Sequence, residues 1–120
     1  MKKVTLVLSA STNPNKYSNI AIKRLIDKGI GVVGLGIRKG TVFGVTIDNE
    51  KKEYKNIDTV TLYLNPKRQE EYYNYIISLK PRRVIFNPGA ENLEFEKLLK
   101  ENNIESEIAC TLVLLSTNQY

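Results

Sequence analysis

The order of apolar and polar positions predicts strands that alternate with helices along the whole chain. Five short apolar runs, rich in β-branched and aromatic residues, have the character of buried strands. They comprise residues 4–8, 32–35, 59–64, 84–86 and 104–109. Apolar residues recur at helical spacing in the intervening and final segments, and the predicted helices lie within residues 18–28, 66–80, 93–102 and 112–115. Strands that alternate with helices in this way form βαβ units with parallel strands and right-handed crossovers.

The sequence therefore predicts a three-layer α/β fold with a five-stranded, mainly parallel sheet, built by residues 1–120 as one domain. Ser18 is placed to cap the first helix and Gly29 to end it, while Asn65 is placed to cap the second. Residues 38–57 depart from the alternation. The β-type residues and the charged turn of this segment favour a β-hairpin or an irregular loop where a helix would otherwise lie.

The chain of 120 residues contains no histidine and a single cysteine, Cys110. These counts exclude a Ser-His-Asp triad, a Cys-His pair, a phosphohistidine and a zinc site built from cysteine and histidine. A lone cysteine also forms no intramolecular disulfide, which suits a reducing cytoplasm.

The formal net charge of +5 favours an anionic partner without naming it. Nucleic acid is not favoured, because the cations are spread along the chain and no zinc-finger or RNP motif is present. Residues 4–10 follow a basic start, but Thr5 and Ser9 interrupt their apolar character, which favours a buried strand over a signal peptide. Since no apolar run approaches the roughly 18 residues of a membrane span, we expect a cytoplasmic protein without a membrane partner.

Ligands of an open parallel sheet bind beyond the carboxyl ends of its strands, near the position where the strand order reverses. The loop after the first predicted strand, residues 9–18, leads into a helix whose free N–H groups and dipole favour a phosphate. Its small residues allow close backbone approach, although Ser, Asn and Pro are also ordinary turn residues. The residues of this loop predicted to bind are Ser9, Ala10, Ser11, Thr12, Asn13, Lys16, Tyr17 and Ser18.

The second predicted strand is followed by Gly36, Ile37, Arg38 and Lys39. A plain NAD site would have an acidic residue here to hold the ribose hydroxyl groups. Two adjacent cations favour instead a nucleotide whose ribose carries an extra phosphate, which means NADP or coenzyme A. A solvated basic turn is the alternative interpretation.

Small and polar residues also follow the later strands. Asn65 comes after the third predicted strand, and Asn87, Pro88 and Gly89 come after the fourth. Gly89 and the adjacent Ala90 would let a thin chain such as pantetheine lie against the backbone. We therefore include all four among the predicted binding residues.

Glu91 is the one carboxylate that the sequence places on this edge, since Asp27, Asp48 and Asp58 fall elsewhere. As a residue at a helix N-terminus it is also a natural partner of the helix dipole. Cys110 ends the fifth predicted strand on the same edge. It is either a small buried apolar residue or a thiol able to form a mixed disulfide with a ligand thiol.

Several short motifs occur in order at these loops. They are Ala10-Ser11, Asn13-Pro14, Lys16-Tyr17-Ser18, Gly40 with Gly44, Asn87-Pro88-Gly89, Glu91-Asn92 and Ala109-Cys110-Thr111. In this order and spacing the chain resembles the small, single-domain CoA-binding proteins of the YccU-like type. Their fold is similar to the CoA-binding domain at the start of the succinyl-CoA synthetase α subunit. In the family the first loop opens Gly-Ala-Ser, and Ser9 replaces that glycine here.

The resemblance implies a Rossmann-like fold that binds coenzyme A or an acyl-CoA, a small nucleotide ligand, without established catalysis. The diphosphate is expected on residues 9–18, the 3′-phosphate near Arg38 and Lys39, and pantetheine along Asn65 and Asn87 to Glu91 and toward Cys110. The synthetase passes a phosphoryl group through a histidine outside this domain, so ligase activity is not expected of a chain without histidine. An NADP-dependent reductase is the alternative, and a nucleic-acid-binding protein is the third possibility.

Overall fold

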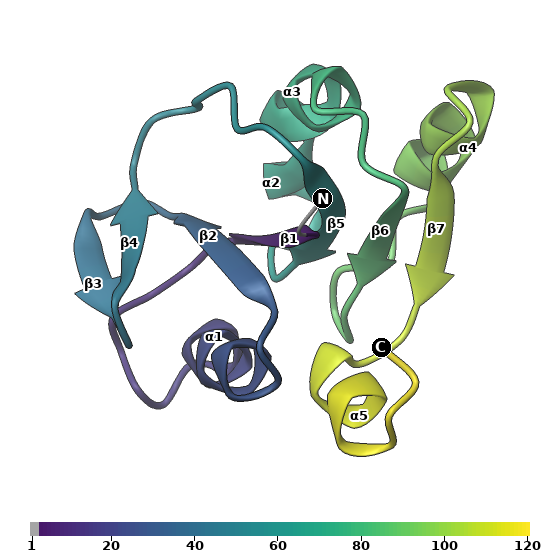
Figure 1. Cartoon of the computed structure of the whole chain (residues 1–120). Helices are drawn as coiled ribbons and strands as arrows, with labels where there is room; N and C mark the ends of the chain where they lie inside the picture. The colour runs from purple at the N-terminus through teal and green to yellow at the C-terminus, as the bar shows by residue number, and fades with distance from the viewer. Residues whose placement is uncertain (1–2) are drawn as a thin grey trace.

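A sheet of seven strands forms the centre of the protein (Figure 1) in the computed structural model, which describes residues 3–120. The strands are β1 (Val4–Leu8), β2 (Gly31–Leu35), β3 (Gly40–Val42), β4 (Val45–Asp48), β5 (Ile57–Leu62), β6 (Arg83–Phe86) and β7 (Glu105–Ile108). Their order across the sheet is β3-β4-β2-β1-β5-β6-β7. Neighbouring strands run parallel except β3 and β4, which are antiparallel. The strand order reverses at β1, because β2 pairs with one side of it and β5 with the other.

The α/β class predicted from the sequence is confirmed, but the sheet has seven strands and not five. The additional strands, β3 and β4, form a hairpin within residues 38–57, as one of the two interpretations of that segment predicted. Its turn lies at Phe43 and Gly44, whose φ angles of 49° and 78° are those of a tight hairpin turn. The charged segment after β4 is therefore not the hairpin turn. Because β4 pairs with β2, the hairpin extends the sheet where a crossover helix would otherwise lie.

Helices cover both faces of the sheet. They are α1 (Tyr17–Asp27), α2 (Pro66–Gln69), the 3₁₀ helix η1 (Glu70–Tyr72), α3 (Tyr73–Ser78), α4 (Leu93–Glu101) and α5 (Thr111–Ser116). In Figure 1, α1 and α5 lie below the sheet, and α3 and α4 lie above it. Leu6 and Leu8 of β1 belong to the apolar core that contains Phe95 of α4, whereas Val7 belongs to the core that contains Ile22 of α1. Both faces of β1 are thus buried, as its nearly continuous apolar sequence predicts.

The ends of the first helix differ in part from the prediction. Gly29, with a φ of 75°, follows α1 as expected of a residue that ends a helix. Ser18, however, lies inside α1, whose N-cap is Lys16, so the predicted cap is wrong. The helix starts earlier because a turn at Asn13 leads straight into it: the Asn13 side chain accepts a hydrogen bond from the N–H of Asn15 (2.9 Å).

The predicted helix over residues 66–80 is divided into α2, η1 and α3. Asn65 caps α2 as predicted, since its Oδ1 accepts a hydrogen bond from the N–H of Arg68 (3.0 Å). The division follows Gln69, which is fully buried and whose Nε2 donates to the carbonyl oxygens of Leu64 and Ala90, both at 2.8 Å. These bonds tie α2 to the loops on either side. Among residues 3–120, no helix is both long enough and apolar enough to span a bilayer.

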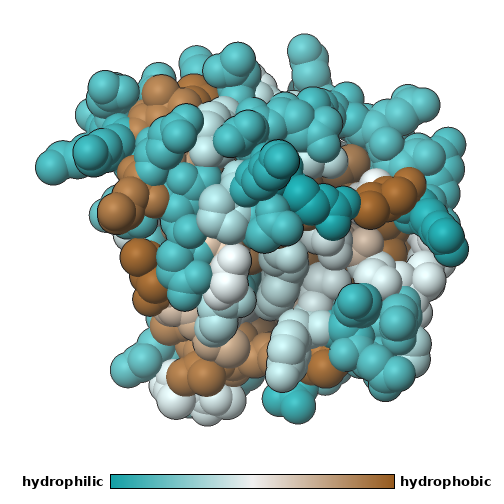
Figure 2. Space-filling model, turned by 180° about the vertical axis from the view of Figure 1, so that it is seen from behind, coloured by the Kyte–Doolittle hydropathy of each residue, from teal (hydrophilic) through white to brown (hydrophobic). Residues whose placement is uncertain are grey.

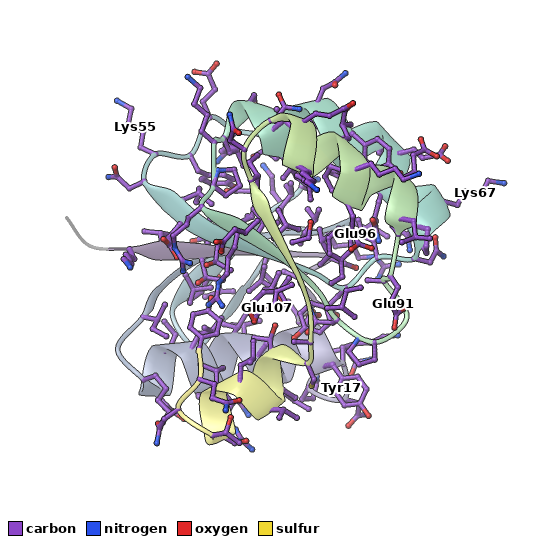
Figure 3. All side chains as sticks on the ribbon, turned by 90° about the vertical axis from the view of Figure 1, so that its right-hand side faces the viewer. Tyr17, Lys55, Lys67, Glu91, Glu96 and Glu107 are labelled. Atoms are coloured by element: carbon purple, nitrogen blue, oxygen red, sulfur yellow. The ribbon has the colours of Figure 1, made fainter. Side chains whose placement is uncertain are left out.

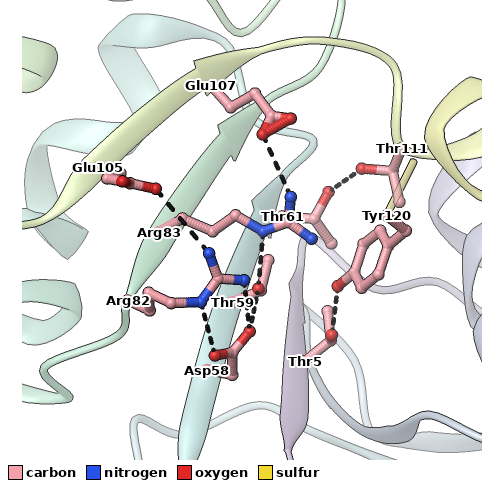
Figure 4. A network of polar contacts seen from close by, with 10 residues as sticks. All are labelled: Thr5, Asp58, Thr59, Thr61, Arg82, Arg83, Glu105, Glu107, Thr111 and Tyr120. Atoms are coloured by element: carbon pink, nitrogen blue, oxygen red, sulfur yellow. Dashed lines mark hydrogen bonds and ion pairs between the residues drawn. The ribbon is translucent and has the colours of Figure 1, made fainter.

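A polar cluster fills the sheet face beside α5 (Figure 4). Arg83 is buried, and its Nε and Nη1 donate to Thr59 Oγ1 (3.0 Å) and Glu107 Oε1 (3.2 Å). The ring of Tyr120 lies over the guanidinium group at 4.4 Å, and its hydroxyl group hydrogen bonds to Thr5. The contacts of Arg83 with β5 involve the first halves of β5 and β6, whereas the hydrogen bond between Thr61 and Thr111 (2.7 Å), drawn in the same figure, lies nearer the carboxyl ends.

Candidate functional site

A cleft of about 810 Å³ opens at the carboxyl ends of the central strands. This volume is in the range of small-molecule sites, roughly 300–1,000 Å³. In Figure 3, Tyr17 and Glu91 lie on the side toward which β1 runs. Figure 2 faces this edge, and residues of intermediate hydropathy, drawn pale, gather toward its middle. Most of the predicted binding residues line the cleft: Ser9, Ala10, Ser11, Thr12, Asn13, Lys16, Tyr17, Ser18, Ile37, Arg38, Asn65, Pro88 and Gly89.

The loop between β1 and α1 forms one wall of the cleft and is held in a defined shape. The N–H groups of Ser9 and Ala10 both donate to the carbonyl oxygen of Leu35, at 2.8 and 3.0 Å. The buried side chain of Asn19, on α1, donates to the carbonyl oxygen of Ser11 (2.9 Å). These bonds fix both the start and the middle of the loop before any ligand arrives.

Several backbone N–H groups of this loop have no hydrogen-bond acceptor within the described residues. Within residues 3–120, the N–H groups of Ser11, Thr12, Tyr17 and Ser18 donate to no protein acceptor. Two of them belong to the first turn of α1, a helix of 11 residues, where the helix dipole adds a partial positive charge. Lys16 lies at the same turn and lines the cleft. This combination suits a phosphate group.

The loop after β2 contributes an apolar side chain and a cation to the cleft. Ile37 is 70% exposed, and it lines the cleft together with Arg38. Lys39 is not among the lining residues; it lies near Asp48, where its charge contributes to a lowered pKa of that carboxyl group. The chief cause of the lowered Asp48 pKa is the hydrogen bond from the Tyr54 hydroxyl group.

Gly36 and Asp48 have structural roles beside the cleft. Gly36 donates its N–H to the carbonyl oxygen of Asp48 (2.8 Å) and packs directly on the backbone of Ala10. Asp48 ends β4, which runs parallel to β2, so this carboxylate does lie on the carboxyl edge of the sheet. The prediction that Glu91 is the one carboxylate there is therefore wrong, because the hairpin brings a strand end to that edge.

Three predicted residues beyond β6 lie outside the cleft lining. Asn87 is buried and binds protein groups of β5 and α5. Glu91 is exposed, and its carboxylate accepts a hydrogen bond from the N–H of Gly89 (2.8 Å). Cys110 is partly buried at the N-cap of α5. The structure thus places the wall after β6 at Pro88, Gly89 and Ala90.

The cleft carries positive charge on both of its sides. Lys16, Arg38 and Arg68 line it, and none of the three forms an ion pair within the described part of the chain. The lining residues include no aspartate or glutamate. Tyr63, which also lines the cleft, has its pKa raised to about 12 by burial, so its hydroxyl group stays neutral. The arrangement is suited to a ligand with several negative charges.

Comparison with known families agrees with this geometry. A family model described as a CoA binding domain matches residues 3–116. The chain belongs to this CoA-binding domain family. No curated protein sequence matches it significantly.

Solved structures similar to this CoA-binding domain protein share its fold. A crystal structure of a protein described as uncharacterized is 50% identical, with a TM-score of 0.96, and the match covers 100% of this chain and 99% of that one. A hypothetical protein from Pyrococcus horikoshii OT3 is 26% identical (TM-score 0.84; 97% and 82% covered). A dinucleotide-forming acetyl-coenzyme A synthetase from Ca. Korarchaeum cryptofilum is 12% identical (TM-score 0.71; 87% and 25% covered), which shows a shared fold alone.

The sequence-based prediction missed part of the lining of the CoA-binding domain cleft. The missed residues are Tyr63, Leu64 and Arg68. Tyr63 and Leu64 were assigned to the strand interior, but β5 ends at Leu62, so both fall in the loop. Asn65 caps α2 at the carboxyl edge of the sheet, and Arg68 lies about one helical turn after Asn65. This spacing is the signal that would have found Arg68.

Ser9→Gly is expected to stabilise the protein by about 0.5–1 kcal/mol, because Ser9 has a φ of 76°, a left-handed conformation that costs a non-glycine residue about 1–2 kcal/mol. The greater freedom of glycine in the unfolded chain offsets part of that gain. Urea unfolding of both proteins measures the difference. As a control, Ser11→Gly should lower the free energy of unfolding, since Ser11 has no positive φ. A loss of stability in Ser9→Gly would contradict the strain at this position.

Proposed function

We propose that this protein binds coenzyme A or an acyl-CoA in the cleft at the carboxyl ends of β1, β2, β5 and β6, and that it does so without catalysing a reaction. The observation that carries the proposal is the juxtaposition of free backbone donors with the unpaired side chains of Lys16 and Arg38 in one cleft. Membership of the CoA-binding domain family supports the same ligand. Coenzyme A supplies a thiol that carries acyl groups as thioesters.

The residues of the cleft fit the parts of coenzyme A. The free N–H groups at the start of α1 and Lys16 would hold the diphosphate. Arg38, which follows Ile37 in the loop after β2, would hold the 3′-phosphate. Pantetheine would lie along the wall that contains Asn65, Pro88 and Gly89. The buried side chain of Asn87 forms its hydrogen bonds with protein groups and supports this wall from the protein interior.

Titration calorimetry with coenzyme A, dephospho-CoA and NADP tests the proposal. Coenzyme A should bind, and it should bind more tightly than dephospho-CoA. Arg38→Glu should lower the affinity for coenzyme A by about tenfold or more, or about 1.4 kcal/mol. The affinity for dephospho-CoA should fall far less, because dephospho-CoA lacks the 3′-phosphate. Arg24→Glu, the same charge change at an exposed position of α1 outside the cleft, is the matched control.

Each other result has a definite meaning. Equal losses for the two ligands in Arg38→Glu would place the 3′-phosphate elsewhere. Binding of NADP without coenzyme A would favour the reductase alternative, which the same cation suits through the 2′-phosphate. If neither nucleotide binds, the proposed function is wrong.

A further inference from the structure

Arg68 is a cation of the cleft that the nucleotide part of coenzyme A does not account for. It follows β5, whereas Arg38 follows β2, and these two strands flank β1 on opposite sides. Arg38 and Arg68 therefore lie on opposite sides of the loop between β1 and α1. The diphosphate and the 3′-phosphate have their partners in that loop and in Arg38. Arg68 is left at the end of the cleft where the pantetheine arm and its acyl group would lie.

The backbone that carries Arg68 is held firmly in place. Its N–H donates to Asn65 Oδ1 (3.0 Å). The next residue, Gln69, is fully buried and donates to the carbonyl oxygens of Leu64 and Ala90, both of which also line the cleft. Gln69 Oε1 in turn accepts a hydrogen bond from the buried side chain of Asn92 (3.0 Å). Arg68 thus lines the cleft from a rigid base, beside a wall that is apolar or small.

The charge of Arg68 has no carboxylate partner within the described residues, and it acts on Tyr72, where it opposes the rise of the pKa that burial causes. Within residues 3–120 its guanidinium group makes no ion pair and no hydrogen bond with another side chain. The adjacent Lys67 differs: it does not line the cleft, and its side chain extends away from the molecule in Figure 3. A guanidinium group presents paired donors that match a carboxylate in a bidentate geometry.

We propose that the cleft is selective for an acyl-CoA whose acyl group ends in a carboxylate, the CoA thioester of a dicarboxylic acid, and that Arg68 is the residue that recognises this carboxylate. The inference rests on the proposed binding of coenzyme A and adds the class of acyl group. Lys16, Arg38 and the free N–H groups anchor every CoA ester alike. Arg68 then distinguishes esters by their distal end.

Matched pairs of esters test the inference by titration calorimetry: malonyl-CoA against propionyl-CoA, and succinyl-CoA against butyryl-CoA. In the wild-type protein at least one dicarboxylic ester should bind about tenfold more tightly than its neutral counterpart. Arg68→Gln should remove this preference while the affinity for free coenzyme A changes less than about twofold. Arg68→Lys should retain part of the preference through its charge. Lys67→Gln, which removes a neighbouring charge outside the cleft, should retain all of it.

The outcomes separate this inference from the proposed function. If coenzyme A binds but no dicarboxylic ester is preferred, the inference is wrong and the proposed function stands. If Arg68→Gln weakens free coenzyme A as much as the dicarboxylic esters, Arg68 serves the nucleotide and the inference is equally wrong. If coenzyme A itself does not bind to the wild-type protein, the proposed function fails first, and the inference fails with it.

Discussion

Gly36→Ala should lower the free energy of unfolding by about 2–3 kcal/mol, the cost of forcing an extra carbon into a closely packed site. A Cβ atom at Gly36 would lie 2.2 Å from the carbonyl oxygen of Ala10. The obstacle is backbone, which no rotamer change can move. The end of β2 and the loop between β1 and α1 would have to separate, and the bonds from Ser9 and Ala10 to Leu35 would weaken with them.

Urea unfolding followed by circular dichroism measures this loss as a lower midpoint at an unchanged slope. Gly40→Ala is the matched control. A Cβ atom there would lie 2.4 Å from Cγ2 of Thr12, an exposed side chain that can rotate away, so its cost should be smaller. A Gly36→Ala protein as stable as the wild type would show that the contact with Ala10 is not close. The same variant should also bind coenzyme A more weakly, because the wall formed by residues 9–18 moves.

Asn87→Leu should cost about 3 kcal/mol of stability, because it leaves buried polar groups without partners and each such group costs about 1–3 kcal/mol. Asn87 Nδ2 donates to Thr61 Oγ1 (2.6 Å) and to the carbonyl oxygen of Leu62 (2.9 Å). Its Oδ1 accepts from the N–H of Thr111 (2.8 Å). One side chain therefore joins β5, the end of β6 and the start of α5. Leucine has a similar size, so lost packing contributes little.

Thermal and urea unfolding measure the effect, with Asn49→Leu as the control. Asn49 is exposed, and its substitution should change the free energy of unfolding by less than about 0.5 kcal/mol. Amide hydrogen exchange adds a local reading, because the N–H of Thr111 should lose its protection first in Asn87→Leu. A small loss of stability, below that of the control, would mean that water replaces the amide at this position.

The fold was largely predictable from the sequence because periodicity reports burial. Val4–Leu8 is apolar on both faces, and both faces are covered by helices. The hairpin was harder to place. Its turn depends on the positive φ of Phe43 and Gly44, and phenylalanine is not a residue typical of that conformation, so the charged segment downstream looked like the turn.

The walls of the cleft nearest the loop of residues 9–18 were also predictable, because the loops that follow parallel strands lie at one edge of the sheet. What the sequence could not show is which polar residues of that edge are used internally. Asn65 and Asn87 are of the same type, and each follows a strand predicted from the sequence, yet only Asn65 lines the cleft, whereas Asn87 is buried under it. That difference depends on α5, a segment far along the chain whose first residue, Thr111, hydrogen bonds to Asn87 and to Thr61 of β5. Sequence position alone carries no information on such a contact.

The fixed shape of the loop between β1 and α1 also bears on how quickly the cleft can fill. Asn19 and the packing of Gly36 on Ala10 hold the loop in its final conformation. A ligand therefore need not wait for a loop to close, and little conformational entropy is lost on binding. For the proposed CoA ligand, association should then be limited by diffusion, which the unpaired cations of the cleft should accelerate at low ionic strength. Differences in affinity among ligands should accordingly lie in their dissociation rates.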